Sequence, residues 1–147
     1  MNLYLRAAMM ADVPLLAEMN RQLIEDEGSR NPMSLAGLEE RMRGWLAGGW
    51  QADLIMSGKE VFGYAVYQMR KDEYFPETDQ VYLRQYFIRR EHRGKVYGKT
   101  GIGLLLENRF PKGCTVIVDV LAGNTIGQRF WASAGFEVYY MNMRLKH

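Results

Sequence analysis

One stretch of the chain decides the fold: YFIRREHRGKVYGK, residues 86–99. It opens with aromatic and β-branched residues typical of a strand. It then continues through basic residues and glycines and leads into an apolar pattern of helical spacing. In such a strand–loop–helix unit, the free amides of the first helical turn and the helix dipole attract a phosphate. The stretch therefore predicts a phosphate site, to which Arg93, Lys95 and Lys99 add positive charge.

Strand and helix patterns alternate on both sides of this stretch. The predicted elements, in order, are a strand at 2–7, a helix at 12–23, a helix at 34–47, a hairpin at 52–67, a strand at 81–88, a helix at 102–109, a strand at 115–121, a helix at 124–131 and a strand at 136–145. Ser34 is predicted to cap the second helix and Gly63 to mark a bulge. The acidic residues 25–27 fall in the turn after the first helix. The run 115–121 is almost continuously apolar, so it predicts a strand buried on both faces.

This order of elements predicts an α/β fold, with a mixed central sheet covered by helices. A chain of 147 residues fits a single domain, residues 1–147. Its formal net charge is +2 and its isoelectric point is near 8.7. This mild basicity suits a bound phosphate better than a long nucleic acid.

Cysteine content and hydropathy indicate where in the cell the protein is expected. Cys114 is the only cysteine, so the chain forms no internal disulfide and no cysteine-based metal cage. No run approaches the roughly 20 apolar residues that cross a bilayer. We therefore expect a cytoplasmic protein with no resident metal and no membrane anchor.

The basic loop resembles the pyrophosphate loop of the GNAT superfamily of N-acetyltransferases. That loop has an Arg or Gln, two residues, a Gly, one residue, and then a Gly or Ala. Arg93 and Gly98 match its first and last positions, while Val96 stands where the family usually has its first Gly. The resemblance implies a GNAT-like fold with a mainly antiparallel sheet.

A second partial motif follows in the order that the family shows. Asn124 comes after the next strand, Phe130-Trp131 forms an aromatic pair, and Gly135-Phe136 follows it. Each of these also has an ordinary structural interpretation: Asn124 is a good helix N-cap, and the aromatic residues can pack a helix end on a sheet. Together with the loop they extend the resemblance over nearly the whole chain.

The resemblance implies acetyl-CoA as co-substrate and direct transfer of its acetyl group to a primary amine, without an acyl-enzyme. The backbone of residues 86–88 would bind the pantetheine arm, and the basic loop would bind the pyrophosphate. The implied cofactor-binding residues are Phe87, Ile88, Arg93, Gly94, Lys95, Val96, Tyr97, Gly98, Lys99 and Asn124.

The catalytic residues are less well marked. The tyrosine that the family uses as general acid is replaced by Trp131, whose indole cannot protonate a thiolate. Tyr139 and Tyr140 on the last predicted strand are substitutes, and Tyr140 is taken as the candidate. For the general base we take Glu27, because the loop between the first two helices borders the acceptor site in this family. Acidic residues at 25–27 would also attract a cationic amine.

Two other functions stay open on sequence grounds. Val96 and Trp131 stand at variant positions, which fits a catalytically degenerate CoA-binding protein. A small nucleic-acid-binding module is the second alternative. It would use the basic residues Arg84, Arg89, Arg90, Arg93, Lys95 and Lys99, and the aromatic residues Tyr82, Tyr86 and Tyr97. The acceptor of the transferase would be a small-molecule amine or a protein amine, and association into a homodimer is compatible with the sequence.

Overall fold

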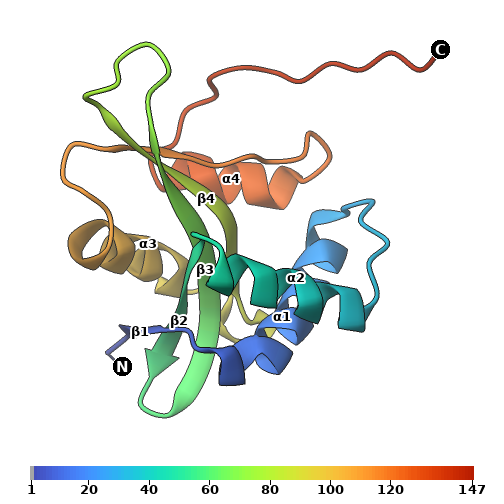
Figure 1. Cartoon of the computed structure of the whole chain (residues 1–147), viewed down its shortest axis with the longest axis vertical. Coiled ribbons are helices and arrows are strands. Elements are labelled where there is room, and N and C mark those ends of the chain that lie inside the picture. Colours follow the sequence, from blue (N-terminus) through green and yellow to red (C-terminus); the bar gives the residue numbers. More distant parts are fainter. Residues whose placement is uncertain (1) are drawn as a thin grey trace.

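The computed structural model describes residues 2–147 and builds them around one five-stranded sheet (Figure 1). The strands are β1 (Tyr4–Ala7), β2 (Gln51–Ser57), β3 (Glu60–Lys71), β4 (Asp79–Ile88) and β5 (Thr115–Ile117), and they lie in this order across the sheet. The first three pairings are antiparallel and the pairing of β4 with β5 is parallel. The structure thus confirms a mixed, mainly antiparallel sheet flanked by helices.

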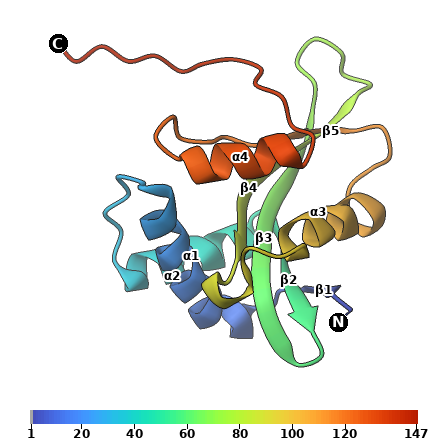
Figure 2. The same cartoon turned by 180° about the vertical axis from the view of Figure 1, so that it is seen from behind.

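Helices cover both faces of the sheet (Figures 1 and 2). They are α1 (Val13–Glu27), α2 (Leu35–Ala47), α3 (Tyr97–Asn108) and α4 (Thr125–Ser133), with short 3-10 turns η1 (Met10–Asp12) and η2 (Arg90–His92). On one face α1 and α2 pack on the side chains of Leu54, Tyr64 and Val66. On the other, α3 and α4 pack on Ala65 and Tyr67. Within residues 2–147, no helix is both long enough and apolar enough to span a membrane.

The helix boundaries follow from local sequence signals, most of them as predicted. The Ser34 hydroxyl accepts a hydrogen bond from the amide of Gly37 at 3.1 Å, and the Asn124 side chain accepts one from Gly127 at 2.9 Å, so both caps are confirmed. The prediction that residues 25–27 lie in the turn after the first helix was wrong. They form the last turn of α1, because the helix continues until Gly28 adopts the left-handed conformation, with φ of 67°.

Two irregularities in the strand register shape the sheet. Between β2 and β3, Ile55 pairs with Gly63 but Met56 pairs with Val61, so Phe62 is an extra residue beside the predicted bulge glycine. A Cβ at Gly63 would overlap the carbonyl oxygen of Phe87 on β4. Only glycine therefore allows β3 and β4 to approach each other here.

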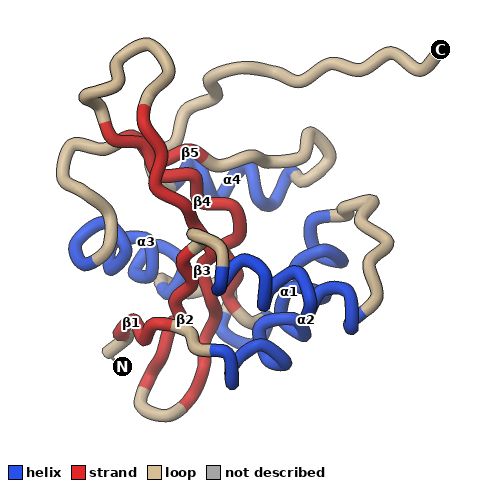
Figure 3. The backbone as a smooth tube through the Cα atoms, in the orientation of Figure 1, coloured by secondary structure: helices blue, strands red, loops and turns tan. Residues whose placement is uncertain are grey.

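The C-terminal part of the fold differs from the prediction. β5 ends at Ile117, and residues 115–121 are half-buried or exposed rather than buried on both faces. Residues 136–145 form no ladder; they extend away from the body, with Tyr139 92% exposed (Figure 3). β5 pairs with β4 only and lies at the edge of the sheet formed within residues 2–147, so it is not enclosed as a fully buried strand would be. The basic loop is also shorter than predicted, because α3 begins at Tyr97.

We expect Gly63→Ala to lower the free energy of unfolding by about 1–3 kcal/mol, because the added methyl group forces β3 and β4 apart. Gly44→Ala on α2 is the control, since a Cβ there meets no atom within 4 Å and alanine favours a helix by up to about 1 kcal/mol. Urea denaturation of both variants checks this. Equal stabilities would contradict the close approach at Gly63.

Candidate functional site

The central feature of the site is the point where β4 loses its second neighbour. β4 pairs with β3 along its whole length, but with β5 only at Gln80, Tyr82 and the residue between them. Beyond Tyr82 the two strands diverge, and the backbone of residues 83–88 faces no strand on that side. Unpaired strand backbone is a ready site for an extended ligand, because its amides and carbonyls need partners. Phe87 and Ile88 lie here, with their side chains buried in the core at 2% and 8% exposure.

The loop after β4 ends at a helix N-terminus that no side chain caps. Gly94 turns the chain with φ of 74°, and the N-cap residue Val96 supplies no side-chain hydrogen bond. The first amides of α3, at Tyr97, Gly98 and Lys99, therefore have no partner inside the helix. Lys95 is exposed nearby, and neither it nor Lys99 forms an ion pair with any residue from 2 to 147. The free amides and free cations fit the pyrophosphate of acetyl-CoA.

Gly98 also has a structural role. A Cβ at this position would lie 2.7 Å from the ring of Phe130, so the glycine lets α3 contact α4. Phe130 and Trp131 in turn pack on Tyr86, with ring centroids 6.2 and 5.8 Å apart. The aromatic pair is thus part of the packing between α4 and β4. The side-chain oxygen of Asn124, another predicted cofactor contact, is used as the cap of α4.

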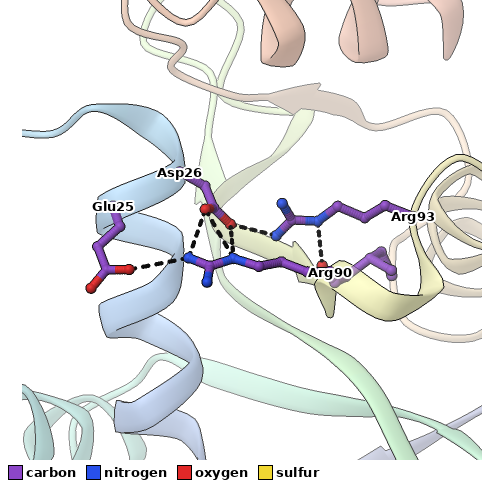
Figure 4. A network of polar contacts seen from close by, with 5 residues as sticks. Glu25, Asp26, Arg90 and Arg93 are labelled. Atoms are coloured by element: carbon purple, nitrogen blue, oxygen red, sulfur yellow. Dashed lines mark hydrogen bonds and ion pairs between the residues drawn. The ribbon is translucent and has the colours of Figure 1, made fainter.

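Two arginines of the basic loop are tied to the end of α1 (Figure 4). Arg90 donates to Asp26 at 2.8 Å and to Glu25 at 3.1 Å, while Arg93 donates to Asp26 at 2.6 Å. Burial opposes the ionisation of Asp26, yet the hydrogen bonds from both arginines outweigh it and hold the pKa of this carboxyl below its usual value. Arg93 also donates to the carbonyl oxygen of Ile88 at 2.7 Å. The network fixes the loop to the α1–α2 side of the molecule.

A cavity of about 280 Å³ opens beside the divergence of β4 and β5. It lies between the end of α1, the segment that follows it, α2, and the middle of β4. Its lining consists of Asn20, Ile24, Glu27, Ser29, Asn31, Arg41, Tyr82, Arg84, Gln85, Asp119 and Leu121. Both the unpaired edge of β4 and the cavity thus begin near Tyr82, so a group held along that edge lies close to whatever fills the cavity.

Glu27 is the predicted catalytic residue that the structure places in this cavity. Its side chain is half-buried, and no residue from 2 to 147 forms a hydrogen bond or ion pair with its carboxylate. Burial, followed by the nearby charge of Asp26, raises the pKa of Glu27. Its neighbours Glu25 and Asp26 are paired with arginines, so of the three acids only Glu27 is free to accept a proton.

Tyr140, the other predicted catalytic residue, is not brought to the cavity. It lies on the extended C-terminal segment with 68% of its surface exposed, and its ring contacts the ring of Tyr139. The tyrosine that does line the cavity is Tyr82, whose hydroxyl donates to Asp119 at 2.6 Å. Burial and this carboxylate raise the pKa of Tyr82 to about 12.

Arg84 and Gln85 were not predicted to line a cavity, because a bulge in β4 determines where their side chains lie. Val66 pairs with Gln85 and Tyr67 with Leu83, so Arg84 is an extra residue on β4. Adjacent residues on a regular strand point to opposite faces, but here both Arg84 and Gln85 line the cavity. Arg41 could have been predicted as a lining residue, because it borders the apolar stripe of α2. Among residues 2–147, no group of three or more His, Cys, Asp or Glu is arranged to hold a metal ion.

Comparison with known proteins agrees with this geometry. A sequence model of the Acetyltransferase (GNAT) family matches residues 16–136. No curated protein sequence matches the chain.

Solved structures share the fold over nearly the whole chain. An acetyltransferase of Trypanosoma brucei is 21% identical, with a TM-score of 0.69, and covers 99% of this chain and 100% of its own. A Clostridium acetobutylicum protein described as a predicted acetyltransferase, solved with acetyl-CoA, is 14% identical, with a TM-score of 0.75 and coverage of 99% and 96%. The aminoglycoside N-acetyltransferase AAC(6')-Iy, solved with CoA, is 18% identical, with a TM-score of 0.76 and coverage of 99% and 95%.

These structural similarities show the fold, and the family match covers most of the sequence, including α1, the diverging strands and the basic loop. The chain belongs to the GNAT family of acetyltransferases.

Proposed function

We propose that the chain is an N-acetyltransferase, which transfers the acetyl group of acetyl-CoA directly to a primary amine. Family membership makes acetyl-CoA the donor. The observation that carries the proposal is the unpaired, half-buried carboxylate of Glu27 in a cavity beside the open edge of β4. A base next to the acyl donor site is what transfer to an amine requires.

The residues divide the chemistry between them. Bound acetyl-CoA would supply a thioester carbonyl, which an amine can attack directly, so that a C–N bond forms, the C–S bond breaks and CoA leaves as its thiolate. The uncapped amides of α3, with Lys95 and Lys99, would hold its phosphates. The free backbone of residues 83–88 would hold the arm and donate an amide to the oxygen on which negative charge develops. Glu27 would take the proton from the ammonium group of the acceptor, and its raised pKa brings it closer to the working pH than an ordinary glutamate.

The nucleic-acid alternative finds less support. Arg90 and Arg93 both form ion pairs with Asp26, and Arg90 also pairs with Glu25. Tyr86, one of the proposed stacking residues, lies against Phe130 with its hydroxyl bonded to Gly98. The basic residues therefore do not form a continuous phosphate-binding surface with exposed aromatic rings.

Glu27→Gln is expected to lower kcat by about a hundredfold or more, because the acceptor loses its base. The wild-type kcat should fall as the pH drops through the pKa of Glu27. That pKa lies above the usual glutamate value of about 4.3, because burial raises it. Steady-state assays across pH check both expectations. In the variant this acid limb should disappear, and the defect should shrink at high pH, where the amine is already neutral.

Glu18→Gln is the matched control, since Glu18 is exposed on the same helix and does not line the cavity. Its kcat should equal that of the wild type. A Glu27→Gln enzyme with full activity and an unchanged acid limb would remove Glu27 from the mechanism.

Arg93→Ala is expected to weaken acetyl-CoA binding by about tenfold, the loss typical of one charge-assisted hydrogen bond. Asp26→Asn should leave binding unchanged or make it tighter, because it releases Arg93 from its ion pair. Calorimetric titration measures both constants, and Arg43→Ala on the exposed face of α2 is the control. If Arg93→Ala binds acetyl-CoA like the wild type, this arginine serves only to tie the loop to α1. If the folded wild-type protein fails to bind acetyl-CoA, the proposed function is wrong.

A further inference from the structure

Two arginines share the acceptor cavity without a carboxylate to neutralise them. Arg41 comes from α2 and Arg84 from the bulge of β4, and both guanidinium groups lie over the ring of Trp45, at 4.4 and 5.1 Å from its centroid. Neither forms an ion pair with any residue from 2 to 147. Burial, followed by the charge of Arg84, lowers the pKa of Arg41. Two like charges held together without a counterion form a site for an anion.

The same end of the cavity has more hydrogen-bond donors than acceptors. Among residues 2–147, the Arg41 side chain donates one hydrogen bond, to the side-chain oxygen Oδ1 of Asn20 at 3.1 Å. The Arg41 Nε and the Asn20 Nδ2 are buried and have no partner among the described residues. Asn20 lines the cavity and is only 1% exposed. Buried donors without acceptors are rare and costly, so they indicate a missing acceptor.

Negative charge in the cavity is provided by other residues. The carboxylate of Glu27, at the end of α1, has no hydrogen-bond or ion-pair partner among residues 2–147. The carboxylate of Asp119 accepts a hydrogen bond from the hydroxyl of Tyr82. Burial raises the pKa of the fully buried Tyr64; the charge of Glu27 raises this pKa further, and the charge of Arg41 lowers it. The cavity therefore offers a carboxylate for an ammonium group and a pair of guanidinium groups for an anion.

We infer that the acceptor is a small amine that also carries a carboxylate, an amino-acid-like zwitterion. This inference rests on the proposed function. The amine would face Glu27, and the carboxylate would face Arg41 and Arg84, whose planar guanidinium groups match its geometry. A volume of about 280 Å³ lies at the lower end of ligand pockets and admits a small molecule rather than a folded partner.

The sequence predicts that the acidic run 25–27 attracts a cationic amine, but Glu25 and Asp26 are bonded to Arg90 and Arg93. Only Glu27 remains for the amine. A polyamine would place additional positive charges next to Arg41 and Arg84, which is unfavourable.

The test compares matched acceptors that differ only in the carboxylate. Amino acids with the amine at the α, β or γ position, and the carboxamide of each, are assayed with acetyl-CoA by following release of the CoA thiol. We expect kcat/KM to be about tenfold or more higher for at least one amino acid than for its carboxamide. Arg84→Gln should lower kcat/KM for the amino acid to about the value for its carboxamide, and Arg84→Glu should reverse the preference. Arg84 is exposed, so both variants should fold, which thermal denaturation verifies. Arg43→Gln, outside the cavity, should keep the wild-type preference.

Each other outcome overturns a specific statement. Carboxamides or polyamines that are acetylated as well as amino acids, with no effect of Arg84→Gln, would overturn this inference and leave the proposed function intact. The inference is also overturned if acetyl-CoA binds but no amino acid is acetylated. If acetyl-CoA does not bind, the proposed function fails, and the inference fails with it.

Discussion

The loss of pairing between β4 and β5 beyond Tyr82 is the constraint on which the site depends. A strand in the middle of a sheet pairs with a strand on each side, whereas residues 83–88 have a partner strand, β3, on one side only. The helices are arranged around this opening. α3 starts directly after it and supplies free amides, α1 ends next to it and supplies Glu27, and α4 packs on Tyr86 of β4.

Electrostatic pairing selects which charged residues remain available. The acids at 25–27 are adjacent in sequence, yet two of them are bound by the arginines of the loop, which leaves Glu27 unpaired. Likewise, Arg90 and Arg93 are neutralised while Arg41 and Arg84 are not. A count of charges along the chain therefore gives the wrong picture of the site. What matters is which charges the fold leaves without a partner, because those can bind a ligand without first breaking an ion pair.

Local signals predicted the parts of the fold that depend on local interactions. The caps at Ser34 and Asn124 were identified because a helix N-terminus needs an acceptor within a few residues. Glu27 was predicted by resemblance and does lie in the cavity. Arg84 could not be predicted as a lining residue, because its direction is set by a register shift against β3. The last strand could not be judged either, since a β pattern does not tell whether a partner edge is available.

The strand order β1-β2-β3-β4-β5 has a consequence for how the molecule folds. β2, β3 and β4 form a continuous antiparallel meander, so their pairing closes only short loops and costs little chain entropy. β1 instead pairs with β2, from which α1 and α2 separate it in the sequence, so this pairing closes a longer loop. We therefore expect the meander to form before the sheet is complete, since local contacts form fastest. The bulge at Arg84 belongs to this meander, so one wall of the cavity would be in place before α1 and α2 dock to close it.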